Sequence, residues 1–234
     1  MLLVRASDVP EYVQDGVVDC GITGADLVQE RGARVEELLR LGFGACRLEA
    51  AVPEESALTA LGDLSGATVA TVYPRLAGTL LRAHGVEASL VEVSGSVEVA
   101  PRLGLADAIV DLVSSGSTLR TNGLRSLGVL FESEAVLVGR GQSDAGEQLV
   151  RLLRPVVDAR SSRYLMLNAR EDAIEEICRI VPGSRSPSVL PLTEPGMVAV
   201  HVLVPAAEVW HLLPRLEAAG ATSILLVPIE RMIA

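Results

Sequence analysis

The chain has 234 residues, which is long enough for two domains or three small ones. Its composition, 49% hydrophobic and 21% charged, is typical of folded globular proteins. A formal charge of −10 argues against electrostatic binding to nucleic acid or an anionic membrane, and 3% aromatic residues disfavour base stacking. Every basic side chain is Arg, which excludes a P-loop lysine or a Schiff-base lysine. Arg alone must supply cationic contacts to phosphates.

Cysteine and histidine give no sign of a metal or disulfide framework. The three cysteines are dispersed among apolar residues and the three histidines share no spacing. No stretch approaches the ~18 uninterrupted apolar residues of a membrane helix, and the start lacks the layout of a signal peptide. We expect a cytoplasmic protein.

The N-terminal part of the chain predicts strands over residues 1–6, 18–23 and 46–52, with a helix after the first and another after the second. The second strand leads into a turn with two glycines. This turn indicates either tight packing or one wall of a ligand cleft; its polar and small residues are Gly21, Thr23 and Gly24.

From residue 67 the pattern alternates between strands and helices. The predicted strands are 68–71, 89–93 and 109–113, and the predicted helices are 76–84, 97–103 and 118–125. Such alternation is typical of βαβ crossovers and predicts a mostly parallel sheet. A long strand then follows over residues 129–138, and its polar break at 132–134 is typical of a chain that crosses back between two lobes.

The last third has a different pattern. An amphipathic helix is predicted over residues 145–157. Beyond a polar joint, strands and helices follow in the order βαββαβ between residues 164 and 228. That order predicts a ferredoxin-like domain, and the absence of a nucleophile–base pair in it favours binding or assembly over catalysis.

The stretch from residue 105 to 122 carries the strongest chemical signal. Asp111 interrupts an apolar strand, and a glycine among hydroxyl side chains follows before a helix begins. Backbone N–H groups in such a strand–loop–helix turn favour an anion such as phosphate. The same residues are also the ordinary components of a turn and a helix cap, so the pattern alone leaves both interpretations open.

Here the sequence resembles a known family. The run 103–119, preceded by residues 95–98, resembles the phosphoribosyl-pyrophosphate loop of the ATP phosphoribosyltransferases, the first enzymes of histidine biosynthesis. Further matches cover essentially the whole chain, in the right order: residues 15–27, 70–74, 186–189 and 220–225.

The resemblance implies an α/β fold with a two-lobed catalytic region like type II periplasmic binding proteins, followed by a ferredoxin-like, ACT-like domain. The implied divisions are residues 1–55 with 129–160, residues 56–128, and residues 161–234. Family members begin with a strand and a helix that carry a Lys-Gly-Arg motif, which this sequence lacks. The alternative is therefore a truncated, non-catalytic, two-lobed ligand-binding or regulatory homologue.

The resemblance also implies a reaction, in which N1 of ATP attacks C1′ of phosphoribosyl pyrophosphate and pyrophosphate leaves. Asp107, Asp111 and Glu98 would hold the ribose, and Asp107 with Asp111 would hold Mg²⁺. The loop for the 5′-phosphate would be Ser114, Ser115, Gly116, Ser117, Thr118 and Leu119. The ATP side would include Gly21, Thr23, Gly24, Thr71, Tyr73 and Pro74.

The C-terminal domain would, by the same resemblance, sense histidine as a feedback inhibitor. Its candidate contacts are Asn168, Ser188 and Ser223, which stand at strand ends, where ordinary capping is an equal explanation on sequence alone. We expect the histidine to bind between copies of the chain in a homo-oligomer, from a dimer to a hexamer. No nucleic-acid or membrane partner is expected.

Overall fold

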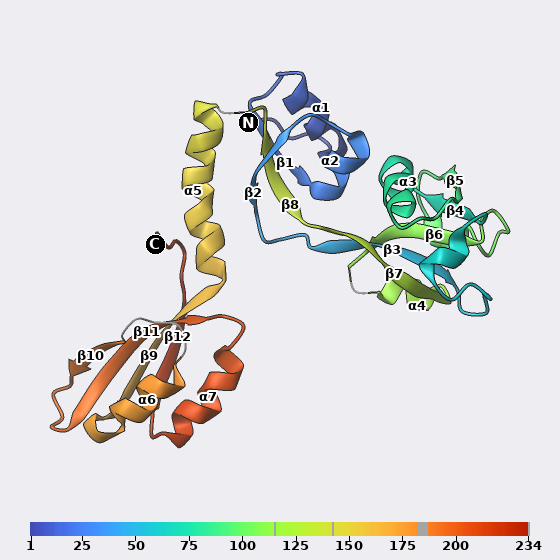
Figure 1. Cartoon of the computed structure of the whole chain (residues 1–234). Coiled ribbons are helices and arrows are strands. Elements are labelled where there is room, and N and C mark those ends of the chain that lie inside the picture. Colours follow the sequence, from blue (N-terminus) through green and yellow to red (C-terminus); the bar gives the residue numbers. More distant parts are fainter. Residues whose placement is uncertain (115, 142, 182–186, 234) are drawn as a thin grey trace. The chain divides into compact units, whose positions relative to one another are not determined.

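The computed structural model describes residues 1–114, 116–141, 143–181 and 187–233 (Figure 1). The chain forms two compact units, Met1–Gln148 and Leu149–Ala234. None of the helices in the described ranges is long and apolar enough to cross a lipid bilayer.

A three-stranded antiparallel sheet with the order β1-β8-β2 forms the first lobe of the first unit. Its strands are β1 (Cys20–Gly24), β2 (Glu36–Arg40) and β8 (Ala135–Gly139), and its helices are α1 (Val9–Gln14) and α2 (Ala25–Arg31). The predicted strand over residues 1–6 is wrong: this segment has no regular structure before a short 3-10 turn, η1 (Ala6–Asp8), and its apolar side chains are exposed.

A five-stranded sheet with the order β5-β4-β6-β3-β7 forms the second lobe. Its strands are β3 (Cys46–Pro53), β4 (Thr68–Thr71), β5 (Ser89–Glu92), β6 (Ala108–Val113) and β7 (Leu124–Ser133). Its helical segments are η2 (Leu61–Leu64), α3 (Pro74–Ala83), η3 (Val97–Val99) and α4 (Ser117–Thr121). β4 runs parallel to β5 and β6, whereas β3 runs antiparallel to β6 and β7. The sheet is therefore mixed, and the prediction of a mostly parallel sheet holds only for its β5-β4-β6 half.

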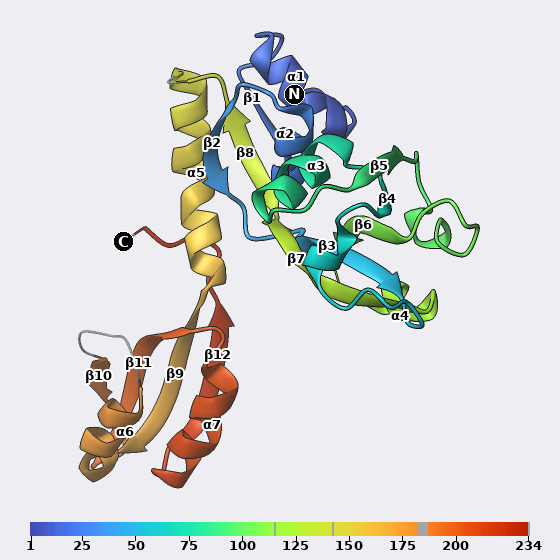
Figure 2. The same ribbon diagram turned by 45° about the vertical axis from the view of Figure 1, so that its right-hand side comes forward.

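The chain crosses between the two lobes where the polar break predicted it. β7 ends at Ser133 in the five-stranded sheet and β8 begins at Ala135 in the three-stranded one (Figure 2). The predicted lobe boundaries at 55 and 129 do not coincide with the sheets, because β3 and β7 both lie wholly in the five-stranded sheet. Their long antiparallel pairing sets the boundary.

The two faces of β6 contribute to different cores. Val110 packs in a cluster with residues of β4 and α3, such as Val69 and Leu76. Ile109 packs on the other face, with the buried residues of η3 and α4 among its neighbours. Since side chains alternate along a strand, Asp111 shares the face of Ile109, toward η3 and α4.

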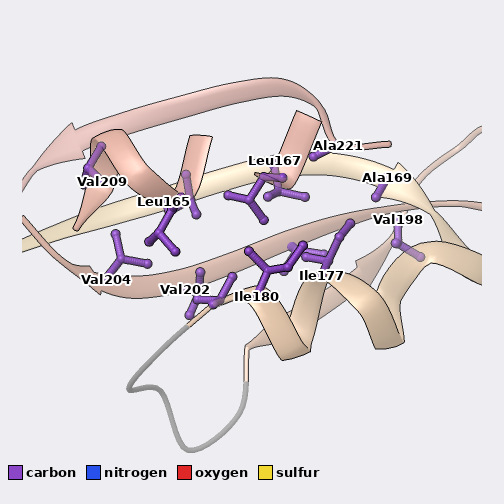
Figure 3. Packing of buried hydrophobic residues seen from close by; sticks show 14 residues of the cluster. Leu165, Leu167, Ala169, Ile177, Ile180, Val198, Val202, Val204, Val209 and Ala221 are labelled. Atoms are coloured by element: carbon purple, nitrogen blue, oxygen red, sulfur yellow. The ribbon is translucent and has the colours of Figure 1, made fainter. Parts of the chain in front are cut away.

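The second unit continues from α5 (Asp144–Arg160), which begins in the first unit, into the predicted βαββαβ order. Its elements are β9 (Ser162–Arg170), η4 (Glu171–Ala173), α6 (Ile174–Ile180), β10 (Ser188–Pro191), β11 (Met197–Pro205), α7 (Val209–Ala218) and β12 (Thr222–Pro228). The sheet order β10-β11-β9-β12, with antiparallel neighbours, confirms the ferredoxin-like fold. Alternate residues of β9 and β11 pack against α6 and α7, as Leu165, Leu167, Val202 and Ile177 illustrate (Figure 3).

Candidate functional site

The loop after β6 has exposed hydroxyl side chains next to one buried leucine. Ser114, Ser117 and Thr118 are exposed, whereas Leu119 is buried beneath them. Gly116 has a φ of 70°, the left-handed conformation that favours glycine. A Cβ added there would lie 3.4 Å from Nη1 of Arg120, so a guanidinium stands beside the loop.

Ser115 of the predicted phosphate loop lies outside the residues that the structure describes. The described residues of the loop combine a left-handed glycine, exposed hydroxyl groups and an adjacent guanidinium, and this combination suits the binding of an oxyanion.

Two of the predicted carboxylates come together at this end of β6. Asp111 is half-buried, and its Oδ1 accepts the N–H of Leu112 at 2.8 Å. Burial raises the pKa of Asp111, the bond from Leu112 lowers it, and the negative charge of Glu98 in η3 raises it again. Asp111 and Glu98 are thus close enough to interact.

Asp107, in contrast, lies at the other end of β6. Its Oδ2 accepts the N–H of Thr68 at 2.8 Å, and its own N–H donates to the carbonyl of Thr68 at 2.8 Å. It lines a pocket of ≈ 600 Å³ there, together with Asp63 and Pro101. Three residues of strand lie between Asp107 and Asp111, and four rises of about 3.3 Å separate the two positions by about 13 Å. This separation disfavours a single ribose or metal ion held by both carboxylates, and the role predicted for Asp107 stays a prediction.

The end of β4 reaches the same edge of the sheet as the end of β6, because the two strands are parallel. Thr71 is fully buried, and its Oγ1 accepts the N–H of Tyr73 at 2.9 Å, so it shapes the turn. Pro74 begins α3. Burial, followed by the charge and hydrogen bond of Asp26, raises the pKa of Tyr73, with smaller contributions from Asp111 and Cys46. The phenol therefore stays protonated at neutral pH.

The predicted residues of β1 serve mainly packing. A Cβ on Gly21 would lie 2.3 Å from Cγ1 of Val9, so the glycine lets α1 approach the strand. Thr23 is buried, and its Oγ1 donates to the carbonyl of Ala6 at 2.7 Å. A Cβ on Gly24 would lie 2.3 Å from Oδ1 of Asp26, so this glycine makes room for the Asp26 carboxylate.

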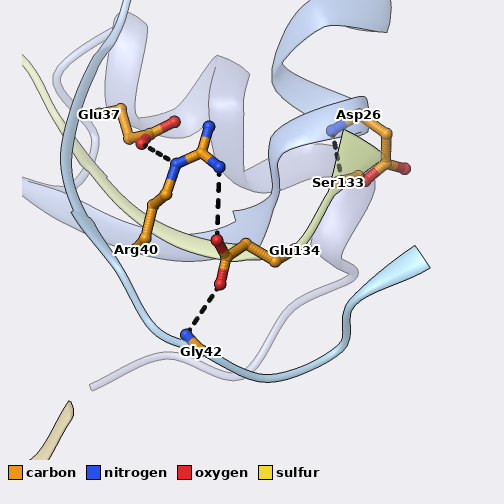
Figure 4. Close-up of polar contacts among 6 residues, drawn as sticks. All are labelled: Asp26, Glu37, Arg40, Gly42, Ser133 and Glu134. Carbon is orange, nitrogen blue, oxygen red and sulfur yellow. Dashed lines mark hydrogen bonds and ion pairs between the residues drawn. The ribbon is translucent and has the colours of Figure 1, made fainter. Parts of the chain in front are cut away.

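Asp26 and Ser133 form a buried pair where the lobes meet. Oγ of Ser133 donates to Oδ1 of Asp26 at 2.6 Å, and the N–H of Asp26 donates to Oγ of Ser133 at 3.0 Å (Figure 4). Each residue is 5% exposed. Cys46 pairs with Ser133 across the strands. Burial, followed by the charge of Asp26, raises the pKa of the Cys46 thiol, and a hydrogen bond with Ser133 lowers it.

Glu134, between β7 and β8, contacts the segment that follows β2. Its Oε2 accepts the N–H of Gly42 at 2.9 Å, and its Oε1 lies 3.4 Å from Nη1 of Arg40 (Figure 4). The Arg40 guanidinium also contacts Glu37 at 2.9 Å.

Asp26 and Ser133 were not among the predicted site residues. The signals for them were a carboxylate directly after the β1 turn and a serine within the polar break of β7. Their contact links residues 107 positions apart, which only the tertiary fold reveals.

A family model described as ATP phosphoribosyltransferase matches residues 5–157, and one described as the HisG C-terminal domain matches residues 159–231. The chain belongs to the ATP phosphoribosyltransferase family. The ATP phosphoribosyltransferase of Cytophaga hutchinsonii is 40% identical over 238 residues, which are 100% of this chain and 83% of that protein. That of Methanothermobacter thermautotrophicus is 42% identical over 240 residues, 100% of this chain and 84% of that protein.

Solved structures agree with this family and its fold. The ATP phosphoribosyl transferase (HisG:HisZ) complex from Thermotoga maritima aligns with a TM-score of 0.59 and 28% identity over 67% of this chain and 79% of that one. A substrate-binding protein of an amino acid ABC transporter aligns with a TM-score of 0.50 and 16% identity over 65% and 71%. The second likeness shows the fold alone, the predicted two-lobed architecture of periplasmic binding proteins.

The C-terminal domain of this ATP phosphoribosyltransferase family member does not gather its three predicted histidine contacts within one copy. Asn168 on β9 pairs with Thr222 on β12, whose Oγ1 donates to the Asn168 carbonyl at 3.3 Å. Ser223 follows, with a φ of 51°, at a bulge. Ser188 lies on β10, at the opposite edge of the four-stranded sheet from β12.

Proposed function

We propose that this chain transfers the phosphoribosyl group of phosphoribosyl pyrophosphate to N1 of ATP, with release of pyrophosphate, the first step of histidine biosynthesis. The observation that carries the proposal is the half-buried Asp111 near the end of β6, with the Glu98 charge acting on it, directly before the left-handed Gly116 and the exposed hydroxyls of its loop. Carboxylates next to an oxyanion loop suit a sugar phosphate, which presents hydroxyls beside a phosphate.

The loop residues would anchor the 5′-phosphate. Ser114, Ser117 and Thr118 offer exposed hydroxyl donors, and Gly116 allows the phosphate to approach the backbone closely. Leu119 holds the loop on the core, and Arg120 beside it provides positive charge. Because this chain has no lysine, the cationic contribution to phosphate binding must come from arginine.

Asp111 and Glu98 would accept hydrogen bonds from the ribose hydroxyls and stabilise the positive charge that develops at C1′ as pyrophosphate leaves. Such preorganised charge can contribute several kcal/mol, on the order of 3 kcal/mol for one donor or acceptor. N1 of ATP would attack C1′ from the side opposite the leaving group, so no covalent intermediate with the protein is required.

Tyr73 would stand on the ATP side. It precedes α3 at the same sheet edge as the loop, and its protonated phenol is held by Asp26, which Ser133 holds in turn. Pairing with buried groups fixes the orientation of the phenol, so Tyr73 and Asp26 would position the adenine ring rather than exchange protons with it.

Mg²⁺ is the cofactor we propose for this reaction. The described residues contain no cluster of three or more side chains that could hold a metal ion unaided. Mg²⁺ is commonly held by one or two carboxylates together with substrate phosphates, and Asp111 and Glu98 fit that pattern. When bound, the ion would offset the negative charge of the pyrophosphate, which a chain with a net charge of −10 does not neutralise by itself.

Mass spectrometry of the product tests the proposed reaction. Incubation with ATP and phosphoribosyl pyrophosphate should yield one nucleotide that carries the mass of ATP plus a phosphoribosyl group, and none when either substrate is omitted. Hydrolysis of phosphoribosyl pyrophosphate without transfer to ATP would contradict it, and so would binding of a substrate without turnover, as in a non-catalytic receptor.

We also propose that the C-terminal domain binds histidine as a feedback inhibitor between copies of the chain. Asn168 and Ser223 are brought near each other through β12, whereas Ser188 of the same copy stands at the far edge, so a site that uses all three needs more than one copy. Histidine should lower activity without competing with phosphoribosyl pyrophosphate. Equal inhibition of a variant that ends at residue 160 would contradict this role.

A further inference from the structure

Helix α3 of the second lobe receives its N-terminal cap from the first lobe. Its first residue is Pro74, and Tyr73 at the N-cap position makes no side-chain capping bond. The next two N–H groups, of Arg75 and Leu76, donate to Oε1 and Oε2 of Glu30 at 3.2 and 2.8 Å. Glu30 lies on α2, so one carboxylate satisfies two free donors of a helix that belongs to the other sheet.

The contact is reciprocal. Nη1 of Arg75 donates to the carbonyl of Arg31, in the last turn of α2, at 3.4 Å. Gly32 follows in the left-handed conformation, with a φ of 60°, and a Cβ there would lie 2.1 Å from Cζ of Arg75. The guanidinium therefore rests against a backbone position that only glycine leaves open. Each helix thus supplies an acceptor or donor that the open end of the other needs.

These caps lie next to the residues of the proposed site. Asp26 stands one turn before Glu30 on α2, and Tyr73 directly precedes α3. The position of α3 against α2 therefore fixes the distance between the Tyr73 phenol and the Asp26 carboxylate. In contrast, Asp111 and the Gly116 loop belong to the second lobe alone.

We propose that Glu30 is a positioning residue for the transfer reaction: by capping α3 from the other lobe, it holds Tyr73 against Asp26 in the arrangement that catalysis uses. This inference rests on the proposed function for its kinetic consequence, although the cap itself does not. Arg75 supports the same arrangement through Arg31 and Gly32.

The first test is kinetic, with Glu30→Ala and Glu30→Gln as variants. Glu11→Gln is the matched control, because Glu11 pairs with Arg31 at 3.4 Å within the first lobe. Loss of the cap should lower kcat about 3- to 10-fold. The KM for phosphoribosyl pyrophosphate should stay nearly unchanged, because its loop lies in the second lobe. Glu30→Gln retains one acceptor and should fall between wild type and Glu30→Ala.

The second test needs no activity. In hydrogen–deuterium exchange of the full chain, the amides of Arg75 and Leu76 should exchange faster in both Glu30 variants than in wild type and in Glu11→Gln. Unchanged exchange at these two amides would overturn the cap, and unchanged kcat alongside faster exchange would overturn the positioning role. If the wild-type chain transfers no phosphoribosyl group but the exchange difference is present, the proposed function fails while the cap stands.

Discussion

Replacing Ser133 with Ala removes a hydroxyl that both donates to the Asp26 carboxylate and accepts the Asp26 N–H, at 2.6 and 3.0 Å. Both residues are 5% exposed, so water cannot replace the lost partner easily. A hydrogen bond to a carboxylate contributes about 1.5–3 kcal/mol, and a buried N–H left without an acceptor costs about 1 kcal/mol or more. We therefore expect the free energy of unfolding to fall by about 2–4 kcal/mol.

Urea unfolding followed by circular dichroism measures this loss. Ser126→Ala is the matched control, because Ser126 lies on the same strand, β7, but is exposed, and such substitutions change stability by no more than about 0.5 kcal/mol. The catalytic rate of Ser133→Ala should fall as well, since Asp26 holds Tyr73. A Ser133→Ala chain as stable as Ser126→Ala would refute the reasoning that this buried pair joins the two lobes.

Three further variants test the site and the regulatory domain. The negative charge of Glu98 raises the pKa of Asp111, so Glu98→Gln should lower that pKa. The acid limb of the kcat/KM profile should then move to lower pH. Gly116→Val should abolish phosphoribosyl-pyrophosphate binding in calorimetry, whereas Gly123→Val, with a similar φ of 66°, should only destabilise the fold, by about 1–2 kcal/mol. Asn168→Asp should bind histidine about tenfold more tightly, because a carboxylate adds a charge-assisted bond.

The pH prediction has a counterpart in stability, because burial raises the pKa of Asp111 in the folded state. A carboxyl group with a raised pKa binds its proton more tightly when folded, so its contribution to stability is lost as pH rises through that pKa. Asp111→Asn does not titrate. Its stability relative to wild type should therefore increase between acidic and neutral pH in parallel urea titrations.

Patterns local in sequence predicted much of the fold. The ferredoxin-like domain followed from βαββαβ order, and the crossing between lobes followed from the polar break that contains Ser133. The prediction of a strand over residues 1–6 was wrong, because an apolar run does not show whether a neighbouring strand is present to pair with it. The helix predicted over 118–125 stops at Thr121, because Gly123 turns left-handed and Leu124 already pairs with β3.

The local geometry of the loop around Gly116 was predictable, because the residues that form it are adjacent in sequence. Sequence could not separate Asp107 from Asp111, because both flank one short strand and only the bond from Thr68 shows that Asp107 serves the opposite edge. Nor could it find Asp26 or Glu30, whose partners lie 107 and about 45 residues away in the chain. Such contacts depend on how the two lobes meet.

Pyrophosphate release from ATP and phosphoribosyl pyrophosphate, measured for wild type, Asp111→Asn and Asp107→Asn, tests the central claim that the sugar is held at the carboxyl end of β6. Wild type should release pyrophosphate only when both substrates are present. Asp111→Asn should lose about 100-fold or more in rate. Asp107→Asn should keep most of the activity, because its carboxylate accepts the Thr68 N–H at the opposite end of β6. Full activity of Asp111→Asn, or loss in Asp107→Asn with an intact fold, would contradict the account.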